Sequence, residues 1–103
     1  MDVRLRFFDG CPGWRVAEER LRTALDETGH HEVTIVRELV TTLDEARERH
    51  FVGSPTILIN GRDPFASAND EPALACRVYP SPGGFSGSPS IEEFVTALER
   101  ADS

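Results

Sequence analysis

Apolar and polar positions divide the first forty residues into a strand, a helix and a second strand. Residues 3–9 alternate and then turn fully apolar, as a half-buried strand does, and they end at a loop signal. From residue 12 the period changes, and an apolar stripe at helical spacing predicts a helix over about 12–28. The stripe consists of Ala17, Leu21, Ala24 and Leu25. Residues 32–40 are rich in β-branched side chains, which predicts the second strand.

The middle of the chain predicts a short helix followed by a buried strand. Thr42 and Glu45 have the spacing of a capping box, in which a hydroxyl and a carboxylate satisfy free amides at a helix start. The helix is expected to run to about His50. Residues 56–60 form a compact apolar strand, and Asn60-Gly61 at its end tolerates the positive φ angles of a tight hairpin turn.

The last part of the chain predicts a long connection, a fourth strand and a third helix. Residues 62–75 show no regular pattern, and connections of this length tend to be functional or mobile. Residues 76–80 predict the fourth strand, and a loop rich in glycine and proline follows it. Ser90 and Glu93 repeat the capping-box spacing at the start of the final helix. The expected order is β-α-β-α-β-β-α.

Composition and charge exclude several classes of protein. With 103 residues and 39% apolar content, the chain is expected to form one domain over residues 1–103. The 18 acidic residues outnumber the 11 basic ones, which argues against a nucleic-acid partner because phosphate contacts need clustered cations. No apolar run approaches the roughly 18 residues of a membrane span, and the first residues lack a signal-peptide layout. A cytoplasmic protein without a membrane partner is expected, and the oligomeric state stays open.

The residues that carry metal and thiol chemistry are few. Two cysteines, Cys11 and Cys76, are too few for a disulfide scaffold, and in a reducing compartment free thiols are expected. The three histidines, His30, His31 and His50, do not have the spacing of a metal site. Neither a metal nor another cofactor is therefore predicted.

A cysteine between the first strand and the first helix, and a later apolar strand that opens with proline, resemble the thioredoxin fold over essentially the whole chain. The residues that carry the resemblance are CPGW at 11–14 and GSPTILING at 53–61. The resemblance implies an α/β fold with a mixed four-stranded sheet, helices on both faces, and a cis Pro55 opposite the cysteine motif. More narrowly, the chain is similar to small thioredoxin-like proteins that are labelled by likeness to alkylmercury lyase.

Cys11 is the candidate nucleophile. Pro12 stands at the first helical position, where its missing amide costs nothing, so Cys11 is expected beside the positive end of a helix, which favours a thiolate. Asp9 would oppose this effect if its carboxylate lay close. Trp14 stands where a dithiol motif has its second cysteine, so the motif holds no resolving thiol. The alternative is a cysteine that remains on an inherited scaffold without a reaction.

Cys76 is a possible second thiol. If the fourth strand runs beside the third, Pro80 lies near Pro55, and Cys76 is four residues further along. At about 3.3 Å per residue this places it about 13 Å away, beyond the roughly 7 Å between Cα atoms that a disulfide tolerates. The expectation is a buried structural cysteine with no direct bond to Cys11. A redox role remains open if the connection 62–75 moves it.

Three further residues are candidates for substrate binding beside Cys11 and Pro12. A cis Pro55 would turn the Ser54 backbone toward the thiol and offer an amide and a carbonyl to an extended peptide or a glutathione-like thiol. The alternative is a proline that only begins a strand, where its absent donor is harmless. Trp14 is expected to pack the start of the helix, and it could also form an aromatic wall beside the thiol.

These observations support three hypotheses. The first is a monothiol oxidoreductase that exchanges disulfides through Cys11 with a low-molecular-weight thiol or with protein thiols and disulfides. The second is a redox-inactive binding module that uses the groove at Pro55. The third is metal or organomercurial handling through Cys11 and Cys76, which requires the two sulfur atoms to approach within a few ångströms.

Overall fold

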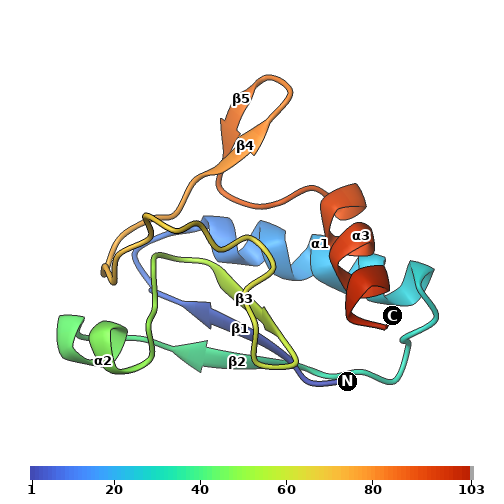
Figure 1. Ribbon diagram of the computed structural model, residues 1–103, viewed down its shortest axis with the longest axis horizontal. Coiled ribbons are helices and arrows are strands. Elements are labelled where there is room, and N and C mark those ends of the chain that lie inside the picture. The colour runs from blue at the N-terminus through green and yellow to red at the C-terminus, as the bar shows by residue number, and fades with distance from the viewer. Residues whose placement is uncertain (103) are drawn as a thin grey trace.

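The computed structural model describes residues 1–102 (Figure 1). The elements are β1 (Val3–Phe7), α1 (Gly13–Glu27), β2 (Ile35–Leu39), α2 (Leu43–Glu48), β3 (Thr56–Ile59), β4 (Tyr79–Ser81), β5 (Gly84–Ser86) and α3 (Ile91–Ala101). The strands β1, β2 and β3 form one sheet, and β4 and β5 form a separate hairpin that projects from the body of the molecule (Figure 1).

β1 is the central strand of the main sheet. It pairs in parallel with β2, starting from Val3 opposite Ile35, and antiparallel with β3, where Val3 lies opposite Ile59. The parallel pair needs a crossover, which α1 provides. Because β1 then leads directly into α1, the short loop between them is held at the end of the central strand.

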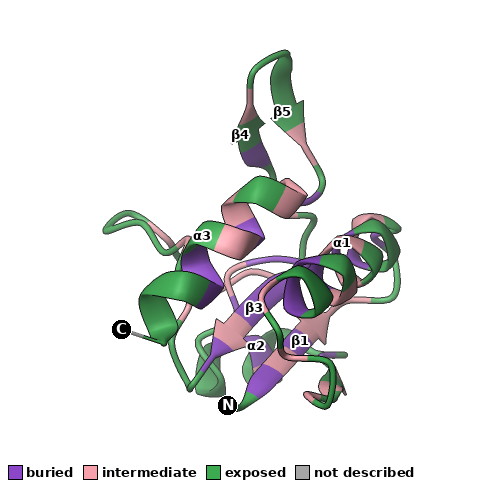
Figure 2. Cartoon of the chain, turned by 90° about the vertical axis from the view of Figure 1, so that its right-hand side faces the viewer, coloured by how far each residue is buried: buried purple, intermediate pink, exposed green. Residues whose placement is uncertain are grey.

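The main core lies between the sheet and two helices. α1 and α3 pack against each other, and their buried residues face those of β1 and β3 (Figure 2). The largest fully buried side chains of this cluster are Leu5, Leu21, Leu25, Ile57, Phe94 and Leu98. A second, smaller cluster of Val40, Ala46 and Phe51 anchors α2. The predicted apolar stripe of the first helix is therefore confirmed.

The opposite face of the sheet carries several charged residues, and the two long helices α1 and α3 pack together on the other face, contrary to the expectation of helices on both faces. Successive residues of a strand point to opposite faces, so Arg4 and Arg6 lie on the side away from Leu5. Glu38 on β2 accepts hydrogen bonds from Arg4 at 3.0 Å and from Arg6 at 2.8 Å. The hydrogen bond from Arg6 is the main reason that the pKa of Glu38 is lowered. The ion-pair network occupies this face, where Val36 and Leu58 lie opposite Arg4 as apolar neighbours.

The predicted four-stranded sheet is wrong. Asn60 and Gly61 have positive φ angles of 53° and 80°, so the expected tight turn forms. Only Arg62 returns beside β3, as a single bridge to Ile59. Pro64 lacks an amide and cannot continue a ladder. The chain then crosses residues 62–75 without a regular element and next forms a strand in the β4–β5 hairpin, away from the sheet.

The helix starts follow the predicted chemistry in part. Ser90 and Glu93 form a complete capping box at α3. At α2 the Thr42 hydroxyl accepts from the amide of Glu45, but the Glu45 carboxylate turns to the amide and hydroxyl of Thr41. In the described part of the chain, no helix combines the length and the apolar character that crossing a membrane requires.

Candidate redox site

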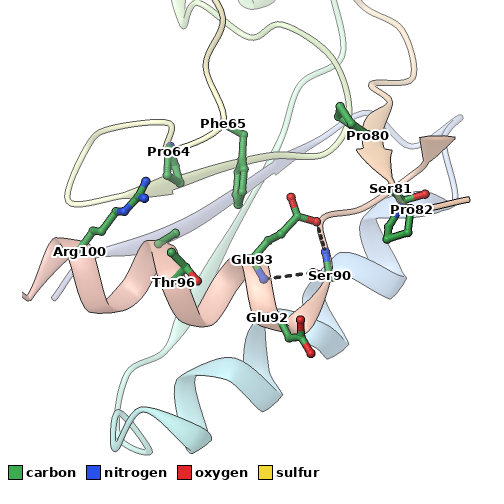
Figure 3. Close-up of a pocket in the computed structure, with 11 residues that line it drawn as sticks. Pro64, Phe65, Pro80, Ser81, Pro82, Ser90, Glu92, Glu93, Thr96 and Arg100 are labelled. Carbon is green, nitrogen blue, oxygen red and sulfur yellow. Dashed lines mark hydrogen bonds between the residues drawn. The ribbon is translucent and has the colours of Figure 1, made fainter. Parts of the chain in front are cut away.

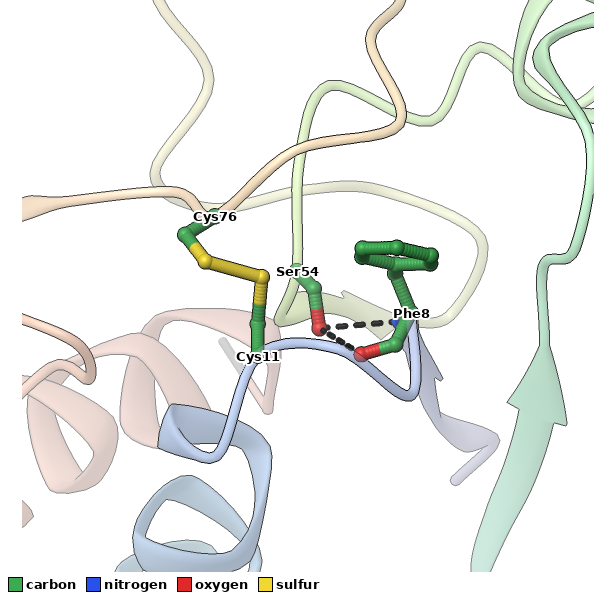
Figure 4. The surroundings of a disulfide bond; sticks show 4 residues. All are labelled: Phe8, Cys11, Ser54 and Cys76. Carbon is green, nitrogen blue, oxygen red and sulfur yellow. Dashed lines mark hydrogen bonds between the residues drawn. A yellow bond between two sulfur atoms is a disulfide. The ribbon is translucent and has the colours of Figure 1, made fainter.

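The two cysteines form a disulfide bond (Figure 4). The Cα atoms of Cys11 and Cys76 lie 5.5 Å apart, across a sequence separation of 65 residues. Two sequence-based predictions are therefore wrong: the thiols are not free, and the sulfur atoms are not held apart. The bond brings the loop after β1 together with the segment that follows the long connection.

The backbone of Ser54 explains why Cys76 lies so close to Cys11. The Ser54 amide donates to the Ala75 carbonyl at 2.8 Å, and the Arg77 amide donates to the Ser54 carbonyl at 2.9 Å. Cys76, between these two partners, forms a parallel bridge with Ser54. The sequence predicted a strand in which Cys76 lies four residues beyond the neighbour of Pro55, whereas the segment 75–77 runs parallel to the chain at Ser54 and pairs with it.

The Ser54 side chain forms hydrogen bonds with the loop that carries Cys11. Its hydroxyl accepts from the Phe8 amide at 2.9 Å and lies 3.4 Å from the Phe8 carbonyl, to which it donates (Figure 4). The same Phe8 carbonyl accepts from the Cys11 amide at 3.1 Å. Ser54 is fully buried. One residue thus joins the segments that carry the two cysteines.

The Ser54-Pro55 peptide bond is cis, as the sequence predicted. Pro55 is buried, and its carbonyl accepts a hydrogen bond from the Tyr79 hydroxyl. Burial is the main reason that the pKa of Tyr79 is raised. The Ser54 amide and carbonyl, which were expected to face a ligand, are occupied by the chain itself. In the disulfide form no peptide groove is open at Pro55.

Cys11 lies close to the start of α1, as predicted, but the helix begins at Gly13, one residue later than expected. Pro12 is the N-cap residue, no side chain in the described structure caps this helix, and its first turn contains no acidic residue. The positive end of the helix dipole therefore lies near Cys11, and no carboxylate in the first turn offsets it. Gly13 lies against the base of the β4–β5 hairpin, since a Cβ atom there would be 2.7 Å from the Gly87 carbonyl oxygen.

The two halves of the disulfide differ in exposure. Cys11 is 2% exposed, whereas Cys76 lies at the surface. A thiol from solution can therefore reach the Cys76 side of the bond more easily than the Cys11 side. A buried Cys76 was expected from the sequence, because residues 76–80 predicted a strand, but the residue is exposed.

Trp14 packs the start of α1, which is the favoured prediction. Its ring stacks on Phe7 with centroids 4.4 Å apart, and the side chain is 8% exposed. The guanidinium groups of Arg15 and Arg37 each lie 5.2 Å from the ring centroid. Phe7 ends β1, so the tryptophan fixes the helix to the strand whose loop carries Cys11.

Arg77 is a site residue that the sequence analysis missed. Its guanidinium donates to Asp63 at 2.7 Å and to the Phe65 carbonyl at 2.8 Å, and it lies 4.7 Å from the ring centroid of Tyr79. The side chain is only 8% exposed. Gly53 permits this approach, since a Cβ atom there would lie 2.9 Å from the Arg77 Cβ. The only sequence signal is an arginine next to a cysteine, which has no specific meaning by itself.

An open groove of about 780 Å³ lies elsewhere, between the long connection, the hairpin and α3 (Figure 3). Phe65, Pro64 and Arg100 border it, and Glu93 folds back onto Ser90. Neither cysteine lines this groove. Among residues 1–102 no group of three or more histidine, cysteine or carboxylate side chains could hold a metal ion.

Comparisons with protein-family models, with curated proteins and with solved structures give no significant match. The resemblance to thioredoxin-like proteins therefore stays untested, and the chemistry of the site rests on its geometry.

Proposed function

We propose that the protein is a thiol–disulfide oxidoreductase in which Cys11 and Cys76 form the redox pair. The observation that carries the proposal is the disulfide itself, which joins a buried cysteine at a helix start to a surface cysteine. The proposal keeps the thiol–disulfide exchange expected from the sequence, but it changes the role of Cys11 from the attacking thiol to the resolving thiol. It adds Cys76 as the second thiol, which replaces the resolving cysteine missing at Trp14.

The exposure of the two cysteines assigns their roles. An incoming thiolate attacks the Cys76 sulfur and forms a mixed disulfide, and Cys11 leaves as a thiolate beside the uncapped amides of α1. A second thiol then releases Cys76. In the reverse direction Cys76 attacks a partner disulfide, and one partner sulfur leaves as a thiolate. Cys11 then attacks the Cys76 sulfur, closes the internal bond and releases the second partner thiolate. Two electrons pass from the pair to the partner in each such cycle.

The proposed partners are low-molecular-weight thiols and protein thiols or disulfides. In the cytoplasmic location expected from the sequence, a reducing pool of small thiols would return the pair to the dithiol form. The protein would then act by reducing disulfides rather than by making them.

Variants with a single cysteine test this proposal. The reduced protein is mixed with 5,5′-dithiobis(2-nitrobenzoate), and release of the coloured thiolate is followed over time. The wild type should release a second equivalent in a step whose rate does not depend on reagent concentration, because Cys11 resolves the adduct on Cys76. Cys11→Ser should stop after one equivalent with a stable adduct, and Cys76→Ser should react more slowly because its thiol is buried. A wild-type adduct as stable as that of Cys11→Ser would refute the proposal.

A second candidate function is binding of a soft metal ion by the reduced pair, because the structure brings both sulfur atoms to one place. Thiolates are preferred ligands of soft metals. The reduced wild type should bind one Hg²⁺ with both thiols protected from alkylation. Binding of one Hg²⁺ to each thiol separately would exclude a shared site.

A further inference from the structure

We propose that Arg77 is a positioning residue of the redox pair, which holds Cys76 within bonding reach of Cys11 when both thiols are reduced. This inference rests on the proposed function, since it concerns the same two cysteines. It assigns a role to a buried cation that the exchange chemistry itself does not use.

Two attachments locate the segment 75–77. The first is the pair of backbone hydrogen bonds to Ser54, at 2.8 and 2.9 Å. The second is the Arg77 side chain, whose guanidinium bonds to Asp63 and to the Phe65 carbonyl. Of the two residues that flank Cys76, Ala75 has no polar side chain. The Arg77 side chain is therefore the hydrogen-bonding group next to Cys76 in the chain.

The surroundings of Arg77 make this anchor strong. The side chains of Arg77 and Asp63 are 8% and 14% exposed, so water screens their ion pair little. The Asp63 oxygen atom approaches the guanidinium at 2.7 Å, which is typical of a charge-assisted hydrogen bond. Asp70 lies 4.0 Å from the same guanidinium and adds a second negative charge. The anchor joins the residue after Cys76 to the beginning of the long connection.

The functional consequence lies in the closing step. When Cys11 attacks a mixed disulfide on Cys76, the rate depends on how often the two sulfur atoms meet, which is an effective concentration. In the oxidised protein the covalent bond holds Cys76 whether or not Arg77 is anchored. In the reduced protein and in the mixed disulfide, the Arg77 anchor and the backbone hydrogen bonds to Ser54 keep Cys76 near Cys11. Loss of the anchor should therefore disfavour the disulfide relative to the dithiol.

The test is the equilibrium between the reduced protein and glutathione disulfide, which gives the internal disulfide and two glutathione thiols. The ratio of oxidised to reduced protein is measured after acid quenching and alkylation. Arg77→Gln should lower the equilibrium constant about tenfold, equivalent to about 30 mV in potential. Asp63→Asn should lower it by a similar factor, and the double variant should be no worse than either single variant. Arg47→Gln, which removes an exposed arginine paired with Asp44 at 3.7 Å, is the matched control and should change nothing.

A merely structural role gives a different result. If Arg77 only stabilises the fold, Arg77→Gln lowers the unfolding free energy of the oxidised and reduced proteins equally, and the equilibrium with glutathione is unchanged. That outcome would overturn the positioning role of Arg77 and leave the proposed function intact. The same holds if the decreases in the equilibrium constant add up in the double variant. If the wild type forms no internal disulfide with glutathione disulfide, the proposed function fails as well. The decay rate of the mixed disulfide gives an independent readout, and it should fall in Arg77→Gln.

Discussion

Reduction of the Cys11–Cys76 disulfide should lower the free energy of unfolding substantially. The bond closes a loop with a sequence separation of 65 residues, and opening it gives the unfolded chain more conformations. For a loop of this length the chain-entropy relation gives roughly 14 cal/mol/K, which is about 4 kcal/mol at 25 °C. The folded state loses little, because Ser54 and Arg77 continue to hold the segment 75–77.

The assay is denaturation by guanidinium chloride, with and without a phosphine reductant, followed by circular dichroism. The oxidised protein should be more stable by about 4 kcal/mol, and the reduced protein should show a larger m-value because its unfolded chain is more expanded. A double variant, Cys11→Ala with Cys76→Ala, should be insensitive to the reductant.

The same free energy must appear in a redox experiment. By the thermodynamic cycle, about 4 kcal/mol of stabilisation means that the disulfide forms about a thousandfold more favourably in the folded chain than in the unfolded one. Glutathione equilibria in buffer and in denaturant measure this ratio. A stability difference below about 1 kcal/mol, or a ratio that disagrees with it by more than tenfold, would refute the loop-closure argument.

Three further predictions concern other residues. Gly13→Ala should destabilise the protein by about 1–3 kcal/mol in denaturation, because the added methyl group meets Gly87, whereas Gly83→Ala, with open space around it, should not. Tyr79→Phe should cost about 1–3 kcal/mol by leaving a buried carbonyl without its donor. Because the pKa of Tyr79 is raised in the folded protein, the neutral phenol stabilises the fold fully below its ordinary pKa of 10.0, and this contribution falls as the pH rises toward the raised pKa. Above pH 10 the free energy of unfolding of Tyr79→Phe should therefore fall less steeply than that of the wild type. Glu38 has a lowered pKa, so it stabilises the fold above its ordinary pKa of 4.5 and loses this effect as pH falls. Between pH 6 and pH 3 the free energy of unfolding of Glu38→Gln should therefore fall less steeply than that of the wild type, as measured by denaturation at each pH.

Local signals predicted the helices because they depend on neighbouring residues. The apolar stripe around Leu21 and the Ser90–Glu93 capping box each lie within a few residues, and both are present. The cis Pro55 followed from the resemblance to thioredoxin-like proteins, and its conformation is confirmed. The position of Cys11 before α1 was also predictable, since the change of period after residue 12 marks the helix.

The position of Cys76 was not predictable in the same way. Its location depends on backbone hydrogen bonds between Ser54 and residues 75 and 77, and backbone groups leave no trace in the side-chain pattern. Residues 76–80 predicted a strand, but the strand forms only from Tyr79, within a hairpin. The Arg77–Asp63 pair spans the irregular connection, so no periodicity relates its members.

The long separation of the two cysteines also has a consequence for protein synthesis. At about 5–20 residues per second, the ribosome adds Cys76 about 3–13 s after Cys11, given the 65 residues between them. Throughout that interval Cys11 has no partner in its own chain, and any disulfide it makes joins it to another molecule. The order of translation therefore makes Cys11 the thiol that small cellular disulfides meet first, although in the folded protein it is the buried one.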